Sequence, residues 1–338
     1  MIPAHGAPLG GARLRACPED FRVDEVLPFE PSGAGEHCLV RVCKRGWTTE
    51  AVARLLAERT GVARGGISFA GLKDRHAVTT QWLSVHSPRP LPGLAPGELA
   101  DGVAVLEAVR NARKLRRGAL SGNRFTLRLR EVDAPRRAVD RRLQAIARRG
   151  VPNYFGPQRF GRDGRNLAQA RAWLLHGEPV RGRTVRGLLL SAVRSDRFNR
   201  LLARRVAEAT WDRLLPGDRA LLDGSGSHFA VEAVDAELHR RTAQGDLHPT
   251  GPLPGVGGDG PTGEVAALEA AVLAEEPELM EALADRGLRA DRRPLRLMPR
   301  WLAWRWPEPA TLELSFTLTS GAYATAVLAE VLATAEGS

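Results

Sequence analysis

The pattern of apolar and polar positions divides this 338-residue chain into three parts, of which the first is rich in strands. There, apolar residues alternate with polar ones, as in half-buried strands. The spacing also predicts a helix over Thr49–Thr60, where Gly61 ends it, and a second helix that Asp133 caps and Gly150 ends. The predicted strands are Phe21–Val26, His37–Cys43, Ile67–Ala70, Val78–Val85 and a segment around Phe125, Leu127 and Leu129.

The middle part is mostly helical, and the last part returns to strands. The predicted helices of the middle part are Asn166–Leu175, Leu188–Leu215, Asp235–Ala243, Glu264–Glu276 and Glu278–Asp285. Gly251–Gly263 holds six glycines and three prolines, a composition that favours an irregular loop. Alternation resumes at Trp301–Trp306 and Leu312–Leu318, and Ser320 is expected to cap a final helix. The pattern therefore predicts a sheet domain that a helical domain interrupts.

Composition narrows the class of protein. A hydrophobic content of 43% is typical of a soluble globular protein, and the length suffices for two domains. No apolar stretch approaches a membrane span, and residues 1–15 lack the apolar core of a signal peptide. The three cysteines have no metal-ligand spacing. We therefore expect a cytoplasmic protein that does not bind membranes.

The excess positive charge lies in the first half of the chain. Residues 1–150 hold 26 Lys and Arg against 15 Asp and Glu, a net charge of +11, whereas residues 151–338 hold 23 against 24. Residues 110–130 alone contain eight basic side chains and no acidic one. This density favours contact with the phosphates of a nucleic acid, although basic side chains also protect the solvated edge of a strand.

A candidate catalytic carboxylate lies between two predicted strands. Asp74 follows Gly71 and is flanked by Lys73, Arg75 and His76. Neighbouring cations favour the ionised form of a carboxylate, and an ionised carboxylate on a loop can act as a nucleophile or a base. Taken alone, the same residues also fit a surface turn whose charges neutralise one another.

The longer string around Asp74 resembles a known family. Phe69–Trp82 reads FAGLKDRHAVTTQW, which is similar to the signature of the TruD family of pseudouridine synthases, whose catalytic residue is the aspartate of this segment. Further similar segments, in the order and spacing of the family, are Pro18–Glu25, Gly122–Leu127, Asn153–Gly161 and Ser320–Thr325. The resemblance therefore covers nearly the whole chain.

The resemblance implies an α+β architecture. The catalytic domain would have the circularly permuted pseudouridine-synthase fold, with a mixed or antiparallel sheet and helices, and would carry an inserted, mostly helical α/β domain. The implied boundaries are residues 1–152 and 294–338 for the catalytic domain and 153–293 for the insertion.

The implied reaction converts uridine-13 in the D-arm of tRNA to pseudouridine without a metal or other cofactor. Asp74 either attacks C1′ or removes the proton at C2′, and the sequence leaves both routes open. The implied substrate-binding residues are Phe21, Asn123, Phe125, Tyr323, Arg15 and Glu25, of which Arg15 is expected to pair with Asp74. The basic residues expected to contact the RNA backbone are Lys114, Arg116, Arg117, Arg124 and Arg128.

Three alternatives have different consequences. A synthase of the same chemistry with broader RNA targets would keep every assigned residue. A non-catalytic RNA-binding or tRNA-folding protein would keep the basic groove but not the chemistry. A glycoside or nucleoside hydrolase would need a second carboxylate as general acid, and the motifs offer none. We expect a monomer with tRNA as its partner and no obligate protein partner.

Overall fold

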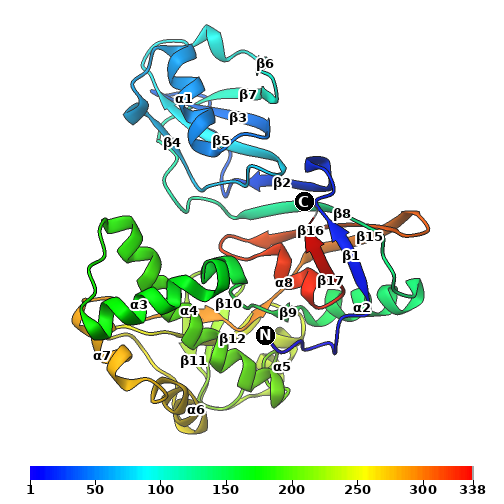
Figure 1. The fold of residues 1–338 in the computed structure, drawn as a ribbon, viewed down its shortest axis with the longest axis vertical. Coiled ribbons are helices and arrows are strands. Elements are labelled where there is room, and N and C mark those ends of the chain that lie inside the picture. The colour runs from blue at the N-terminus through cyan, green and yellow to red at the C-terminus, as the bar shows by residue number, and fades with distance from the viewer. Residues whose placement is uncertain (337–338) are drawn as a thin grey trace. The chain divides into compact units, whose positions relative to one another are not determined.

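The computed structural model describes residues 1–336, which pack into two compact units. The first, here called the sheet unit, consists of Gly10–Ala134, Arg300–Gly321 and the described residues from Leu332 onward. The second, here called the helical unit, consists of Met1–Leu9, Pro135–Pro299 and Ala322–Val331. Each is described by itself below, and the ribbon in Figure 1 labels their elements.

The sheet unit is built on one eleven-stranded mixed sheet. Its main order is β15-β16-β8-β2-β5-β3-β7-β6, with β1 beside β8 and β17, and β4 beside β5. Most neighbours are antiparallel, but β2 runs parallel to β5 and β1 runs parallel to β17. The strands are β1 (Gly11–Leu14), β2 (Phe21–Val26), β3 (His37–Arg45), β4 (Ile67–Phe69), β5 (Val78–His86), β6 (Gly97–Ala100), β7 (Val103–Asn111), β8 (Gly122–Arg130), β15 (Arg300–Glu308), β16 (Thr311–Thr319) and β17 (Ala333–Glu336).

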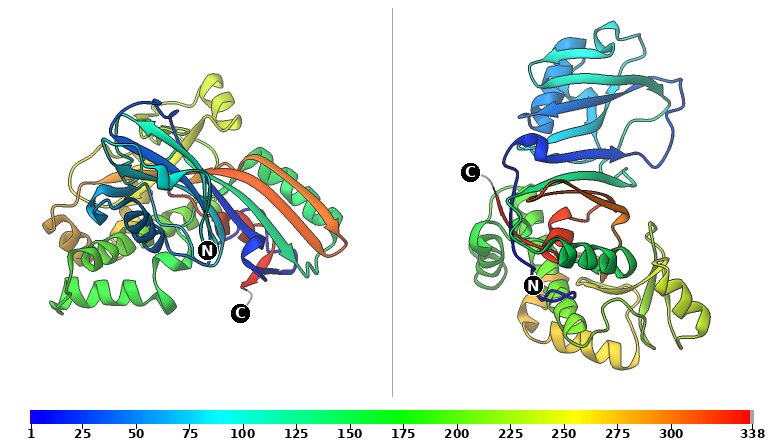
Figure 2. Two further views of the ribbon diagram at one scale, coloured as in Figure 1. Left: turned by 90° about the horizontal axis from the view of Figure 1, so that it is seen from above. Right: turned by 90° about the vertical axis from the view of Figure 1, so that its right-hand side faces the viewer.

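Helix α1 (Thr49–Thr60) packs on the β4-β5-β3-β7 part of this sheet, as Figures 1 and 2 show. The side chain of Thr48 accepts a hydrogen bond from the Ala51 N–H, and Gly61 ends the helix with a φ of 68°. Val52 and Leu56 on its inner face join Val40 and neighbouring strand residues in a buried cluster. The predicted helix and its glycine stop are confirmed.

Strand register decides which side chains share a face of the sheet. Val23 lies opposite Phe125, and Glu25 lies opposite Asn123, where β2 runs beside β8. Because side chains alternate between the two faces of a sheet, Phe21, Glu25, Asn123 and Phe125 all lie on one face. This face supports the candidate active site.

The helical unit contains a four-stranded sheet of order β11-β10-β12-β13. The longest helix, α4, packs on β12 and contributes Phe198, Leu201 and Leu202 to a buried aromatic and aliphatic cluster. The helices are α2 (Arg136–Arg149), α3 (Arg165–His176), α4 (Arg183–Ala207), α5 (Ala236–Ala243), α6 (Gly263–Leu273), α7 (Pro277–Asp285) and α8 (Ala324–Ala329). The strands are β9 (Val151–Pro152), β10 (Arg219–Leu222), β11 (His228–Ala230), β12 (Leu247–Leu253), β13 (Asp291–Pro294) and β14 (Arg296–Leu297), of which β9 pairs with β14.

Two predicted helix caps are wrong. Helix α2 begins after Pro135, and the carboxylate of Asp133 instead accepts a hydrogen bond from the Gly11 N–H. The last helix begins after Tyr323 rather than after Ser320. Asp133 and Ser320 both match the sequence pattern of a helix N-cap. The carboxylate of Asp133, however, is hydrogen-bonded to Gly11, which is distant in the sequence.

Several element boundaries in the middle part also differ from prediction, and helix α4 begins at Arg183 rather than at Leu188. Helix α4 ends at Ala207, eight residues before the predicted Leu215, and the chain turns at Ala209 with a φ of 53°. Strand β12 extends to Leu253 and so includes the first residues of the predicted loop. Gly251 fits there because a Cβ atom would meet side chains of Leu295, Leu201 and Phe198. In this strand glycine permits close packing rather than an irregular turn.

The compact units group the chain differently from the domain boundaries implied by the resemblance. Residues 1–9, 135–152, 294–299 and 322–331, which were assigned to the catalytic domain, pack with the helical unit. The units follow packing alone, so the domain boundaries stay a prediction.

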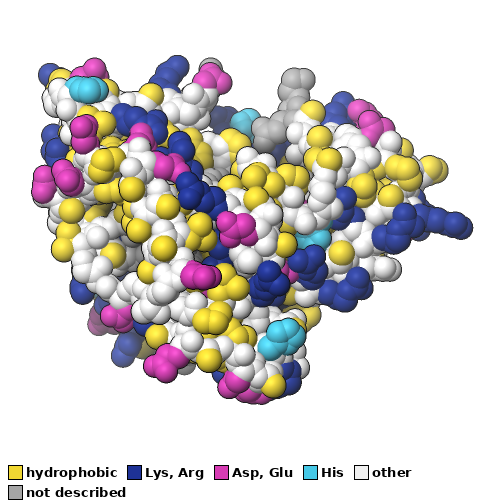
Figure 3. All heavy atoms as spheres, turned by 90° about the horizontal axis from the view of Figure 1, so that it is seen from below, with side chains coloured by type: hydrophobic (Ala, Val, Ile, Leu, Met, Phe, Trp, Pro, Cys, Tyr) yellow, Lys and Arg dark blue, Asp and Glu magenta, His cyan; other side chains and the backbone are white. Residues whose placement is uncertain are grey.

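The charged surface is mixed on the face that Figure 3 shows, where acidic side chains lie scattered among basic ones. None of the helices in residues 1–336 combines the length and the apolar character needed to cross a membrane.

A buried ion pair in the helical unit predicts a large loss of stability on substitution. The guanidinium of Arg205 binds both carboxylate oxygens of Asp218 at 3.0 Å, and these side chains are 1% and 0% exposed. We expect Asp218→Asn to lower the free energy of unfolding by about 3–5 kcal/mol, because it leaves a buried cation without its counter-charge. Glu237→Gln, in an exposed pair with Arg240, should change it by less than about 1 kcal/mol. Urea unfolding of both variants measures the difference, and equal losses would contradict the prediction.

Candidate active site

The loop that carries Asp74 connects β4 to β5 and rests on a buried polar network. The hydroxyl of Thr49, at the start of α1, accepts a hydrogen bond from the Lys73 N–H at 2.9 Å and donates one to Gln81 at 2.8 Å. The amide of Gln81, on β5, donates to the Gly71 carbonyl at 3.3 Å. Helix, strand and loop are thereby joined directly below Asp74.

Lys44 adds a charged support to the same loop. Its side chain is completely buried at the end of β3, and its ammonium donates to the carbonyls of Trp47 at 2.8 Å and of Asp74 at 2.7 Å. Burial lowers the pKa of Lys44 to about 8, although the nearby Asp74 opposes this shift. Lys44 therefore fixes the backbone of Asp74, while the side chain of Asp74 stays 37% exposed.

Both carboxylate oxygens of Asp74 have a partner. Arg15 Nη2 lies 2.7 Å from Oδ2, and the N–H of His76 donates to Oδ1 at 3.1 Å. The expected pair between Arg15 and Asp74 is thus present in the structure. These two donors fix the orientation of the exposed carboxylate.

Arg15 reaches Asp74 from a strained position after β1. Its φ is 60°, in the left-handed region that residues other than glycine rarely adopt. The guanidinium carbon lies 4.2 Å from the centre of the Phe21 ring, within the range of a cation–π contact. Strained backbone of this kind is characteristic of functional sites.

Glu25 and Lys73 form a second, buried ion pair beside the loop. Lys73 Nζ lies 2.5 Å from Glu25 Oε1, and Oε2 accepts a hydrogen bond from the Trp82 N–H at 2.8 Å. Burial raises the pKa of Glu25, and the Lys73 ammonium opposes that shift. Glu25 thus links Lys73, the residue before Asp74, to the backbone of β5. The side chain of Glu25 is itself buried.

Three aromatic rings lie together on the site face of the sheet. Phe125 packs edge-to-face with Phe21 at 6.2 Å between ring centres and lies 5.6 Å from Phe316. Next to them, Asn123 is half-buried, and its Oδ1 has no hydrogen-bond partner in the described chain. A buried acceptor without a partner is uncommon in a folded protein and marks a place where a ligand can donate a hydrogen bond.

Tyr323 belongs to the helical unit and is described with it. Its hydroxyl is 3.0 Å from Arg159 Nη2, and its ring packs against the cluster that contains Phe155 and Phe198. The guanidinium of Arg293 lies 4.1 Å from the Phe155 ring, and burial lowers the pKa of Arg293 to about 10. The segment Asn153–Gly161 therefore contributes the hydroxyl partner of Tyr323.

The basic segment between β7 and β8 is anchored to the strand that leads into the Asp74 loop. Ser68 donates to the Leu115 carbonyl at 2.9 Å, and the Gly118 N–H donates to the Ala70 carbonyl at 2.8 Å. The exposed side chains of this segment include Lys114, Arg116 and Arg117, which form no ion pair within residues 1–336. They line a hollow of about 450 Å³ together with Arg64 and Phe69.

Arg124 and Arg128 lie on the opposite face of the sheet from Asn123 and Phe125, because they alternate with them along β8. Arg128 is 3.0 Å from Glu313 on β16. Their contact with RNA stays a prediction, and it would involve a different face of the sheet from that of Asp74.

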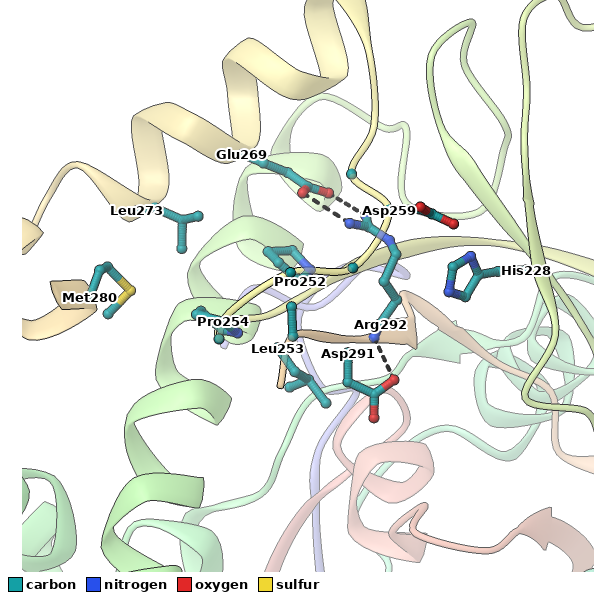
Figure 4. Close-up of a pocket in the computed structure, with 15 residues that line it drawn as sticks. His228, Pro252, Leu253, Pro254, Asp259, Glu269, Leu273, Met280, Asp291 and Arg292 are labelled. Carbon is teal, nitrogen blue, oxygen red and sulfur yellow. Dashed lines mark hydrogen bonds and ion pairs between the residues drawn. The ribbon is translucent and has the colours of Figure 1, made fainter. Parts of the chain in front are cut away.

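A pocket in the helical unit is a weaker candidate for a functional site (Figure 4). Its volume is about 290 Å³, and most of the charged side chains that line it are paired within the helical unit. Arg292 binds Glu269 and Thr250, and Asp259 pairs with Arg219. These pairings leave little unsatisfied polar chemistry for a ligand.

Four residues that support the site were not predicted from the sequence. Lys44, Thr49, Gln81 and Phe316 all contact the Asp74 loop or the aromatic face. Gln81 was visible as part of the motif string, and Phe316 as an apolar position of a predicted strand. Nothing in the local pattern separates Lys44 from a solvated lysine at a strand end.

Comparison with solved structures identifies the fold. The crystal structure assigned as a tRNA pseudouridine synthase D from Methanosarcina mazei matches with a TM-score of 0.74 and 23% identity, over 98% of this chain and 96% of that one. The fold is that of a pseudouridine synthase, which confirms the predicted α+β class.

Sequence comparisons are more specific. The family model described as tRNA pseudouridine synthase D (TruD) matches residues 4–181 and 180–331. The tRNA pseudouridine synthase D of Xanthomonas axonopodis pv. citri is 48% identical and covers 98% of this chain and 94% of its own. That of Nitrosococcus oceani is also 48% identical and covers 99% and 95%. The chain belongs to the TruD family, as the motifs predicted.

The buried Lys44 predicts opposite effects of pH on stability and on turnover. Because its pKa is about 8 in the folded protein and near 10.5 in the unfolded chain, the unfolded state binds more protons between these values, so stability rises with pH there. The rise should total about 3 kcal/mol. Turnover should fall over the same interval, because the neutral amine holds the Asp74 carbonyl less firmly.

Lys44→Met is the matched control for this prediction. The difference in unfolding free energy between wild type and Lys44→Met, measured by urea unfolding from pH 7.5 to 10.5, removes the contributions of other groups. A difference that does not change with pH would contradict the assignment of the low pKa to Lys44.

Proposed function

We propose that this protein isomerises uridine-13 in the D-arm of tRNA to pseudouridine, with Asp74 as the catalytic carboxylate. The observation that carries the proposal is the exposed carboxylate of Asp74 beside the aromatic face of a pseudouridine-synthase sheet. Arg15 pairs with this carboxylate, and Lys44 binds the Asp74 carbonyl. The names of the relatives and the TruD motifs support tRNA as the substrate, and the position within tRNA follows from the family resemblance alone.

Asp74 has the properties that the first chemical step requires. Breaking the bond between uracil N1 and ribose C1′ needs an ionised carboxylate, either to attack C1′ or to remove the proton at C2′. Arg15 stabilises the Asp74 carboxylate without covering it, since more than a third of the Asp74 side chain is exposed. Both routes use the same geometry, and both need no cofactor.

The neighbouring face can hold the detached base. The unsatisfied Oδ1 of Asn123 can accept a hydrogen bond from the imide N–H of uracil. Phe125 and Phe21 supply an apolar wall beside it. The assignment of Tyr323 to the base stays a prediction from the family resemblance. Removing a base from its stack costs a few kcal/mol, and contact with aromatic side chains offsets part of that cost.

The RNA backbone is proposed to follow the basic segment next to the loop. Lys114, Arg116 and Arg117 are exposed and not paired with carboxylates in the described chain, so phosphates need displace no internal partner. Arg124 and Arg128 would extend this path on the other face.

Pseudouridine mapping of unmodified tRNA transcripts tests the proposal. A single new pseudouridine at position 13 is expected after incubation with the protein. Additional sites in other RNAs would favour the synthase of broader range. Binding without any modification would favour a non-catalytic RNA-binding protein, and release of free uracil would indicate a hydrolase.

Asp74→Asn should abolish turnover while the dissociation constant for tRNA changes by less than about threefold. The amide preserves the size of the side chain but cannot act as nucleophile or base. Mapping and filter binding on the same protein preparation measure both effects. Turnover close to that of wild type would remove Asp74 from the mechanism.

Charge reversal in the basic segment should weaken tRNA binding and reduce its dependence on salt. For Arg116→Glu with Arg117→Glu, the slope of log K against log salt should fall by about one for each phosphate that the protein no longer binds. The adjacent residues Arg240 and Arg241 provide a control, since each already pairs with a carboxylate on its own unit. An unchanged slope in the first variant would place the segment off the RNA path.

A further inference from the structure

A large aromatic side chain at the start of β15 points into solvent. Trp301 is 78% exposed, the highest value among the large hydrophobic residues of the described chain. Tryptophan is usually well buried, because its ring removes more apolar surface from water than almost any other side chain. Its position therefore needs a physical reason.

The backbone at Trp301 is strained. Its φ is 53°, in the left-handed region that glycine adopts freely and bulky residues rarely do. Between the pairs Arg300–Thr317 and Ala303–Ser315, β15 has one more residue than β16, which is a β-bulge. Bulges redirect side chains and occur frequently beside active sites. Here the chain holds a tryptophan outward at a conformational cost that glycine would avoid.

The bulge lies at the active-site end of the sheet. Phe316 on β16 lies opposite the bulge, and Phe316 pairs with Phe125 on β8. Trp301 is thus two strands from the strand that carries Asn123 and Phe125, or about 10 Å in the direction of the hydrogen bonds. β15 is also the edge strand, so one side of it remains open.

An exposed arginine precedes Trp301. Arg300 is exposed, as Trp301 is, whereas Arg305 further along β15 pairs with Glu313. An exposed aromatic ring next to an arginine is typical of surfaces that bind unpaired nucleotides.

We propose that Trp301 stacks on an unpaired nucleobase of the bound RNA that lies next to the target uridine. The ring provides a sequence-tolerant platform, and the adjacent Arg300 contacts a neighbouring phosphate. Trp301 would thus bind the RNA outside the base site and take no part in the chemical step. The inference rests on the proposed function only in that the ligand is an RNA.

The test compares Trp301→Ala, Trp301→Phe and Trp301→Gly. Loss of one stacked base should raise the dissociation constant for tRNA by about 5- to 150-fold in the alanine variant, the equivalent of ~1–3 kcal/mol, with kcat unchanged at saturating RNA. The phenylalanine variant should retain most of the affinity. Leu106→Ala, at an exposed apolar position on β7 of the same unit, is the control and should bind tRNA like wild type.

The glycine variant separates binding from folding. Glycine relieves the left-handed backbone, so Trp301→Gly should unfold at a higher temperature than Trp301→Ala while it binds tRNA equally poorly. A residue with only a structural role would change affinity and stability in the same direction. Transcripts with 2-aminopurine beside the target uridine should show fluorescence quenching with wild type and not with Trp301→Ala.

Two results would overturn the inference. One is an alanine variant with the affinity of wild type for tRNA. The other is an alanine variant that alters the sedimentation of the free protein and leaves RNA affinity intact, which would make this surface a protein contact. If wild type forms no pseudouridine and Trp301→Ala still weakens RNA binding, the proposed function fails and this inference stands.

Discussion

The buried ammonium of Lys44 is the contact on which the geometry of the candidate active site depends. A catalytic carboxylate must be accessible to its substrate, so packing around the side chain cannot fix it. In this protein the constraint acts on the backbone instead, where Lys44 binds the carbonyl of Asp74, and Thr49 binds the amide of Lys73. Burying a cation is costly, as its lowered pKa indicates, and two carbonyls offset only part of that cost. The result is a loop whose backbone is held in place while the side chain of Asp74 stays exposed.

The two-residue period of the strands places the aromatic residues and the arginines of β8 on opposite faces of the sheet. On β2 and β8, one set of alternate residues provides Phe21, Asn123 and Phe125 on the site face. The other set places Arg128 against Glu313, which also pairs with Arg305. A shift of one residue in either strand would exchange these sets. The long antiparallel registers of β8 with β2 and β16 therefore maintain the chemistry of the site as well as the fold.

Sequence patterns predicted local features well and tertiary ones poorly. The helix Thr49–Thr60 was predicted in full, because its cap, its apolar stripe and its glycine stop all act within a few residues. The caps at Asp133 and Ser320 were wrong, because Asp133 binds the distant Gly11 and the last helix begins later. Strand β7 was not predicted at all, although it pairs with β3 along its length. For the site, the motif string identified Asp74 and its pairing with Arg15, whereas Lys44 becomes meaningful only when β3 and the loop meet.

Net charge alone also overstates the surface available to a polyanion. Of the basic residues in the first half of the chain, Arg130 binds the buried Asp20, Lys73 binds Glu25, Lys44 is completely buried and Arg15 neutralises Asp74. These cations stabilise the sheet unit and its carboxylates, and they contribute little to long-range attraction. Lys114, Arg116 and Arg117 differ in being exposed, and their segment is anchored to the strand that enters the Asp74 loop. Because screening limits electrostatic attraction to about 10 Å, exposed cations at this place act mainly on anions close to the Asp74 loop. The distribution of paired and exposed cations, rather than their number, therefore determines where the sheet unit can attract a polyanion.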